Sequence, residues 1–211
     1  MKLRLASLCL LALCLTLVAL PVTAQTVYSN GPTNGNTSVW DIFNPYIVSD
    51  TFNVSNNHTA ITGADFAVWL FPGNTLLAAE LSITSGENGG TTYFDQFVDF
   101  TQNDCVVNRD MLDVCQEHTS FSGPTLNSGV YWLNVQNTDV EGSAPHAYWD
   151  ENSGPSSASE NEVGTIPSES FTLLGGSGST TTTGTVPEAS SIVLFGSGFL
   201  GVVGLLRHKL L

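Results

Sequence analysis

The chain has 211 residues, of which 19 are Asp or Glu and only 5 are Lys or Arg, so its formal net charge at pH 7 is −14. Surfaces that bind nucleic acid or anionic lipid need clustered basic residues, and this composition excludes both classes of protein. Hydrophobic residues make up 42% of the chain, which is too many for a chain that is disordered throughout. The length allows one domain with appendages.

The first 24 residues have the three parts of a secretory signal peptide. Lys2 and Arg4 give a positive start, residues 5–20 are almost entirely apolar, and small residues precede Gln25. We therefore expect cleavage before Gln25 and export of the remainder. The alternative is an N-terminal membrane helix, which the short apolar stretch and the cleavage site disfavour.

Residues 25–174 form the predicted folded body, and their hydrophobic pattern repeats every two residues, the period of a β-strand. The predicted strands are residues 49–54, 64–71, 76–84, 91–101, 130–137, 147–150 and 169–174. Turn sequences rich in Gly, Pro and Asn separate them. The pattern predicts an all-β fold, an antiparallel and jelly-roll-like β-sandwich. The one helical expectation is a short helix over residues 109–117.

Two of the four cysteines lie in the signal segment, which leaves Cys105 and Cys115 in the body. An even pair in an exported domain predicts a disulfide. For so short a loop, the bond adds roughly 3 kcal/mol to the free energy of unfolding. The alternative is a metal site that includes His118, although the nearby sequence lacks the remaining ligands of a zinc site.

Residues 95–117 are the most acidic part of the chain. Carboxylate oxygens are the ligands that calcium prefers, and the candidate ligands here are Asp99, Asp104, Asp110 and Asp113. Their spacing does not match an EF-hand loop. Two interpretations stay open, a calcium site and a solvated acidic face, and no other cofactor is expected.

Trp132, Asn134 and Gln136 alternate with apolar residues and are predicted to share the polar face of one strand. An exposed Trp ring can stack on the C–H face of a sugar while neighbouring amides bond its hydroxyls. This pattern predicts a polysaccharide-binding patch. The alternative places the tryptophan in the core or at a sheet edge.

The sequence offers little support for catalysis. It contains no G-x-S-x-G elbow, no H-E-x-x-H motif and no phosphate-binding loop. Arg109 is the only Lys or Arg between the signal and the C-terminal tail, so an anionic substrate would find few partners. We expect a non-catalytic body, with a glycosidase-like carboxylate pair as the least favoured alternative.

Residues 175–186 are rich in Gly, Ser and Thr, a composition typical of flexible linkers. The apolar segment 190–206 follows, and its length lies at the lower limit for a transmembrane helix. The basic residues Arg207, His208 and Lys209 are expected to hold its end in the cytoplasm. A buried globular helix is the alternative, which the four glycines of the segment disfavour.

The end of the chain therefore combines the short motif Pro187, Glu188, Ala189 with a glycine-containing apolar segment and a basic cluster. This combination resembles the PEP-CTERM sorting signal, although Ala189 stands where that family has a second proline. The resemblance covers residues 186–211. It implies a bacterial protein that a membrane protease-transpeptidase, exosortase, recognises and processes near the motif.

Together these features predict an exported protein that is anchored in the cell envelope or released after processing. Its β-sandwich body is expected to be a non-catalytic surface or matrix component. The alternative function is binding of extracellular polysaccharide, with or without calcium. The expected partners are an exosortase-like enzyme, the membrane through residues 190–206, and polysaccharide, but no nucleic acid.

Overall fold

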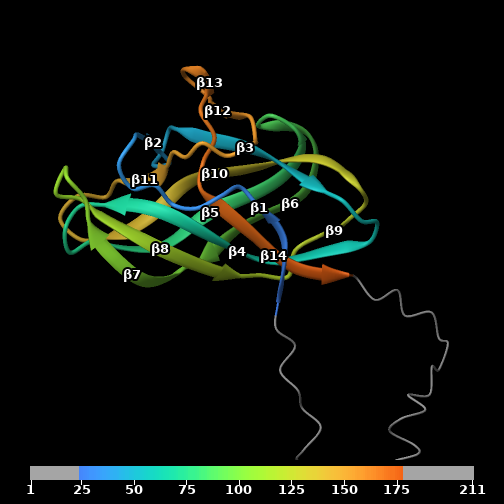
Figure 1. Cartoon of the computed structure of the whole chain (residues 1–211), viewed down its shortest axis with the longest axis horizontal. Helices are drawn as coiled ribbons and strands as arrows, with labels where there is room; N and C mark the ends of the chain where they lie inside the picture. Colours follow the sequence, from blue (N-terminus) through green and yellow to red (C-terminus); the bar gives the residue numbers. More distant parts are fainter. Residues whose placement is uncertain (1–23, 178–211) are drawn as a thin grey trace, which may run out of the picture. The chain divides into compact units, whose positions relative to one another are not determined.

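The computed structural model describes residues 24–177, which form fourteen strands in two antiparallel sheets and, over this range, no helix (Figure 1). The prediction of an antiparallel β-sandwich is confirmed, while the jelly-roll connectivity stays a prediction. Nothing in residues 24–177 has the length and apolarity of a membrane-spanning helix. The predicted helix at 190–206 lies outside the described residues, as does the signal segment up to residue 23.

The first sheet, sheet A, has eight strands. They are β1 (Gln25–Ser29), β2 (Val39–Asp41), β4 (Thr59–Leu70), β7 (Thr101–Val107), β8 (Asp113–Ser120), β9 (Thr125–Leu126), β11 (Ala147–Asp150) and β14 (Phe171–Ser177). The long strand β4 organises this sheet, because it pairs with β8, β9, β11 and β14. Strand β7 pairs only with β8 and forms an edge.

The second sheet, sheet B, has six strands in the order β13-β12-β3-β10-β5-β6. Their bounds are β3 (Ile47–Val54), β5 (Thr75–Gly86), β6 (Gly89–Asp99), β10 (Gly129–Glu141), β12 (Ala158–Glu160) and β13 (Gly164–Ile166). The single strand predicted over 91–101 is in fact two. The chain leaves sheet B at the end of β6 and joins sheet A at the start of β7.

The inner faces of both sheets form one hydrophobic core. In β4 the alternate residues Ala64, Phe66 and Val68 are buried in it. Phe66 packs edge-to-face on Trp149 of β11, with ring centroids 5.3 Å apart, and Phe171 of β14 packs on the same Trp149 at 5.6 Å. Burying each such side chain stabilises the fold by roughly 1.5–3 kcal/mol, so period-two burial holds the sheets together.

The helix expected over residues 109–117 is wrong. Residues 109–112 lie in the connection between β7 and β8, and β8 begins at Asp113. Asn108 closes this connection, because its Oδ1 accepts hydrogen bonds from the backbone N–H of Asp110 (2.9 Å) and of Leu112 (3.0 Å). A two-turn helix has little stability of its own, and pairing of β8 with β4 and β7 outweighs it.

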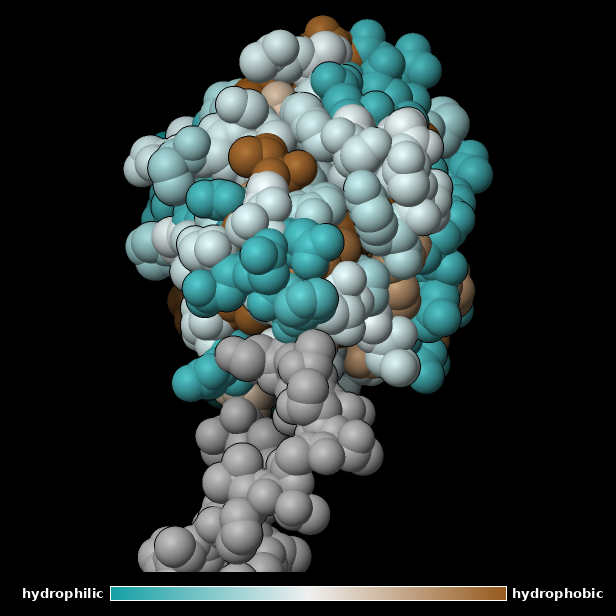
Figure 2. All heavy atoms as spheres, turned by 90° about the vertical axis from the view of Figure 1, so that its right-hand side faces the viewer, coloured by the Kyte–Doolittle hydropathy of each residue, from teal (hydrophilic) through white to brown (hydrophobic). Residues whose placement is uncertain are grey.

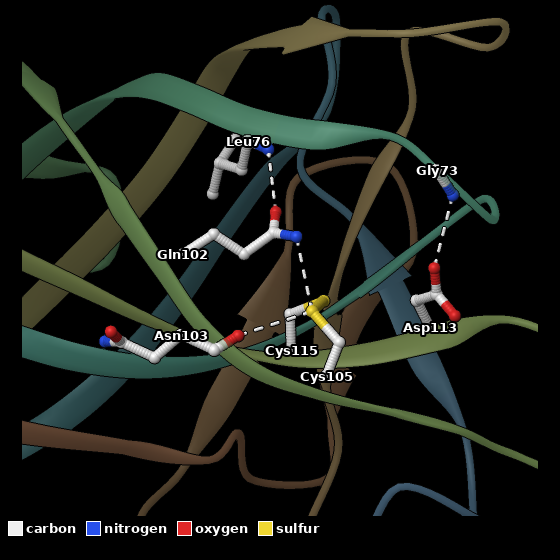
Figure 3. The surroundings of a disulfide bond; sticks show 7 residues. All are labelled: Gly73, Leu76, Gln102, Asn103, Cys105, Asp113 and Cys115. Carbon is white, nitrogen blue, oxygen red and sulfur yellow. Dashed lines mark hydrogen bonds between the residues drawn. A yellow bond between two sulfur atoms is a disulfide. The ribbon is translucent and has the colours of Figure 1, made fainter.

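The predicted disulfide is confirmed. Cys105 of β7 and Cys115 of β8 are paired across the ladder and joined by a disulfide (Figure 3). Cys115 is buried in the core and Cys105 is exposed. The alternative metal site with His118 is wrong, since the two thiols are consumed and the His118 imidazole contacts Asp65.

The two ends of the described chain lie side by side. Strands β1 and β14 are antiparallel neighbours, with Gln25 opposite Gly175 (Figure 1). The chain therefore enters and leaves the sandwich at the same end. Both sheets and the disulfide lie within residues 25–177.

Candidate functional site

A groove of about 560 Å³ lies on the outer face of sheet A. Its floor comes from β4, β8 and β14, where Asp65 and Gln116 alternate with residues of the core. The segment after β1 forms one wall. The polar residues that line it are Ser29, Thr33, Asp65, Asn103, Gln116, Glu117, Ser170 and Thr172. Hydroxyl and amide groups outnumber the two carboxyl groups, Asp65 and Glu117, and no basic residue lines the groove, which suits a neutral polar ligand better than an anion.

A second depression, of about 280 Å³, continues the groove past Thr33 and Gln116, which line both. These two side chains are joined, since Gln116 Nε2 donates a hydrogen bond to Thr33 Oγ1 at 2.8 Å. The second depression is more apolar, with Val106, Val107 and Val114 in its lining. The two together offer an elongated surface with a polar part and an apolar part.

The wall of the groove is held in place by a buried carboxylate. Asp150 accepts hydrogen bonds from the backbone N–H groups of Asn34 (2.9 Å) and Gly35 (3.0 Å). The indole N–H of Trp69 donates a third at 2.7 Å. Burial raises the pKa of Asp150, and these three donors oppose that rise. The segment after β1 is thus anchored before any ligand binds.

Beside the groove, three side chains form a hydrogen-bonded relay on the outer face of β4 and β8. Asp65 Oδ1 lies 2.7 Å from His118 Nδ1, and His118 Nε2 lies 3.1 Å from Ser120 Oγ. The strand register explains this, because Asp65 pairs directly with His118, and Ser120 follows two residues later on the same face. This is the order of groups in a serine hydrolase triad.

The surroundings of the relay do not favour hydrolysis. Its carboxylate is 45% exposed and its imidazole 38%, whereas a triad carboxylate is buried. A serine nucleophile also needs N–H groups aimed at the developing oxyanion. The N–H that follows Ser120, that of Phe121, already donates to Thr62 O at 2.9 Å. Both ring nitrogens of His118 are already bonded, and the imidazole holds the Asp65 carboxylate, which lines the groove.

The residues predicted to bind sugar are brought together on β10 but differ from the expectation. Trp132 is half-buried and Asn134 is only 1% exposed. The Asn134 amide donates to Ser82 Oγ and Thr84 Oγ1, both at 3.0 Å, and accepts from the Asn88 N–H at 3.2 Å. The Asn134 amide is thus committed within the protein, because the turn between β5 and β6 covers it.

Gln136, the third residue of that predicted patch, donates a hydrogen bond from Nε2 to Glu80 Oε1 at 2.9 Å. Trp132 and Gln136 stay a predicted ligand site, with their neighbour Asn134 removed from it.

The predicted calcium ligands are not gathered at one point. Asp99 ends β6, Asp104 lies in β7, and Asp110 pairs with Arg109 at 3.5 Å. Asp113 accepts a hydrogen bond from the Gly73 N–H at 3.2 Å (Figure 3). Within residues 24–177 no group of three or more His, Cys, Asp or Glu side chains is arranged to hold a metal ion. The carboxylates of this segment thus give a calcium site no support.

The surface seen in Figure 2 is mainly hydrophilic or near neutral, with hydrophobic residues isolated from one another. That face carries no large apolar patch of the kind that marks a permanent protein interface. The sorting motif at Pro187, Glu188 and Ala189 lies outside the described residues, as does the basic cluster at Arg207, His208 and Lys209.

Sequence reasoning missed the groove, because its residues come from distant segments. The available signal was the alternation of Gln116, His118 and Ser120 with Cys115 and Glu117, which the expectation of a helix obscured.

No protein-family model matches this sequence, and a search of curated proteins finds no relative of it. Function is therefore inferred from the geometry of the chain itself.

Proposed function

We propose that the chain is an exported bacterial surface or matrix protein, sorted by an exosortase-like enzyme, whose non-catalytic body binds neutral polysaccharide in the groove on sheet A. The groove is the observation that carries the binding part. It is elongated, lined by hydroxyl and amide groups, and continued by an apolar depression. A sugar ring also combines a polar part with an apolar part, since its hydroxyls are polar and its C–H face is apolar.

Export is supported by the disulfide between Cys105 and Cys115, because such bonds persist in oxidising compartments outside the cytosol. The position of the chain ends supports attachment at one end, since Gln25 and Gly175 are opposite each other. Residues 175–177, predicted as the start of the linker, belong to strand β14. In this proposal residues 178–186 are a stalk and residues 190–206 span the membrane, with Arg207, His208 and Lys209 on its cytoplasmic side. Processing near Pro187 and Glu188 would retain or release the body.

Matched glutamine variants on the two outer faces test the binding site. Residues 25–177 are titrated by calorimetry with the exopolysaccharide of the producing organism and with neutral hexasaccharides. Gln116→Ala removes a groove side chain and is expected to weaken binding about tenfold, or about 1.4 kcal/mol. Gln136→Ala makes the same change on sheet B and should leave binding unchanged.

Two results would contradict the groove as the binding site. The first is loss of binding in Gln136→Ala or Trp132→Ala but not in Gln116→Ala, which would assign binding to sheet B. The second is no binding by the unaltered protein at millimolar hexasaccharide and saturating exopolysaccharide. Release of sugar products during the titration would contradict the non-catalytic role.

The sorting proposal is tested by cell fractionation. The full chain should be retained in the envelope, whereas a chain truncated after Thr185 should be found in the medium. Glu188→Gln should reduce processing, seen as a change in mobility of the full chain. Equal retention of the full and truncated chains would refute sorting by the C-terminal segment.

A further inference from the structure

A buried polar cluster joins four distant segments inside the sandwich. Its members are Asn30 after β1, Asp50 of β3, Ser156 between β11 and β12, and Glu169 just before β14. Asn30, Asp50 and Glu169 are fully buried. Asp50 faces the interior because it lies between the core residues Val48 and Phe52 in the alternation of β3.

Hydrogen bonds hold this cluster in one geometry. Asn30 Nδ2 lies 3.1 Å from Asp50 Oδ2 and 2.6 Å from the backbone oxygen of Glu169. The Glu169 N–H donates to the same Asp50 Oδ2 at 2.7 Å. Gly154 packs so closely that a Cβ there would lie 2.3 Å from the Asn30 backbone oxygen. The Asp50 carboxyl group is thus fixed against the backbone of Glu169 by a tightly packed frame.

Three oxygens of these carboxyl groups have no partner. Asp50 Oδ1 and both side-chain oxygens of Glu169 are buried and accept no hydrogen bond. An ionised carboxylate buried in this way costs several kcal/mol unless a charge or a donor compensates it. Nearly all buried polar groups in folded proteins do have a partner, so these oxygens indicate a missing one.

No basic side chain of the described chain can supply that partner. Arg109 is the only Lys or Arg within residues 24–177, and it is exposed and paired with Asp110. Asp150 and Glu151 add further negative charge near Glu169. Asp150 is already bonded by three N–H groups.

Proton uptake alone compensates this site incompletely. Burial, followed by the charges of Asp50 and other acids, raises the pKa of Glu169 well above its ordinary value. Burial raises the pKa of Asp50 only to about 6, because hydrogen bonds oppose the rise. The Asp50 carboxyl group therefore loses its proton more readily than the Glu169 carboxyl group does. A bound cation would satisfy its charge and the open oxygens together.

We propose that Asp50 and Glu169 bind a divalent cation of the calcium class inside the sandwich. Their unpartnered oxygens are hard ligands of the type that calcium takes. The two carboxylates would supply the negative charge. The Ser156 hydroxyl and the Glu169 backbone oxygen are the neutral oxygens of the same cluster. The cation would link the end of β1 to β3 and to the start of β14, and so tie both ends of the body together.

The test uses the full chain, exported, purified in detergent and stripped with EDTA. Thermal unfolding at pH 7 is followed by tryptophan fluorescence, with and without millimolar CaCl₂, and binding is measured by calorimetry. A site saturated about a hundredfold above its Kd should raise the Tm by roughly 5–10 °C. Calorimetry should give one calcium per chain.

Asp50→Asn and Glu169→Gln are nearly isosteric and remove the buried charge, so both variants should fold. Each should lose the calcium-dependent rise in Tm and, without calcium, should unfold at a higher temperature than the unaltered chain. Asp99→Asn with Asp110→Asn is the matched control, since it removes two exposed acids of the 95–117 segment and should keep the full rise.

Two outcomes overturn the proposal. One is an unaltered chain that shows neither binding heat nor a rise in Tm with calcium. That result would mean that protons, and not a cation, neutralise the two carboxyl groups. The other is a rise that persists in Glu169→Gln and is lost in the exposed pair. Both carboxyl groups face the interior, so failure here would leave polysaccharide binding in the groove unaffected.

Discussion

The two outer faces of the sandwich carry similar side chains but offer them differently. On sheet A, Gln116 lies exposed along a groove and its amide bonds one hydroxyl, that of Thr33. On sheet B, Asn134 has the same chemistry but is buried, and its amide makes four hydrogen bonds under the turn between β5 and β6. The difference teaches that an amide on the polar face of a strand becomes a ligand group only where no loop covers it.

The same contrast holds for the carboxyl groups. Glu117 lies on β8 between the exposed residues Gln116 and Ser120, yet it is 1% exposed and neither of its oxygens has a hydrogen-bond partner. Glu80 on β5 of sheet B is half-buried and accepts hydrogen bonds from Gln136 and Asn137. Glu117 is thus buried without a hydrogen-bond partner beneath the groove that it helps to line, whereas Glu80 is part of a surface network.

The largest expected effect is the pH dependence that Glu117 confers. Burial raises the pKa of Glu117 from 4.5 to about 8 in the folded state. The folded protein therefore binds this proton more tightly than the unfolded chain. The contribution of Glu117 to the free energy of unfolding is fully present below pH 4.5 and is lost as the pH rises from 4.5 through 8. Over this range the loss is on the order of 4 kcal/mol. Urea unfolding in EDTA at several pH values should show Glu117→Gln flattening this dependence.

Glu80→Gln is the control for that measurement, since it changes an acid of the opposite sheet whose oxygens are already bonded. It should leave the slope of stability against pH between 6 and 8 as it is. A Glu117→Gln protein with the unaltered slope would show that Glu117 is solvated in solution.

Reduction of the disulfide should have the next largest effect. Both cysteines lie in strands of sheet A. Opening the Cys105–Cys115 bond should lower the free energy of unfolding by roughly 3 kcal/mol. Ligand binding should weaken as well, because β7 contributes Asn103 to the groove. Denaturant titration with and without dithiothreitol measures the loss. A Cys105→Ser, Cys115→Ala protein, already without the bond, should not respond to the reductant.

The smallest effects come from the side-chain amides of Asn134 and Gln116. Asn134→Ala removes the donor to the Ser82 and Thr84 hydroxyls and the acceptor of the Asn88 N–H, so it should cost about 2 kcal/mol of stability. Gln116→Ala exposes a single hydroxyl to water and should cost less than about 0.5 kcal/mol. Urea titration of both proteins compares them. Equal losses would mean that the two faces are equally covered.

The alternation of apolar residues was enough to predict the fold class. Each of the seven predicted strand segments overlaps an observed strand, because a residue buried every second position fixes both the period and the inner face. The short strands β1, β2, β9, β12 and β13 were missed, since two to five residues carry too little pattern. Strand β8 was mistaken for a helix because its apolar face includes Glu117 and Thr119.

The sequence by itself determined the all-β body, the pairing of Cys105 with Cys115, and the expectation of export, since each depends on local pattern or on a count. Only the tertiary structure decided which polar groups are accessible to solvent or to a ligand. Strand register set Asp65 beside His118, and the packing of distant segments buried Asn134, Glu117, Asp50 and Glu169. The physical reason is that hydrogen bonding and desolvation depend on neighbours in space, which strand alternation alone does not specify.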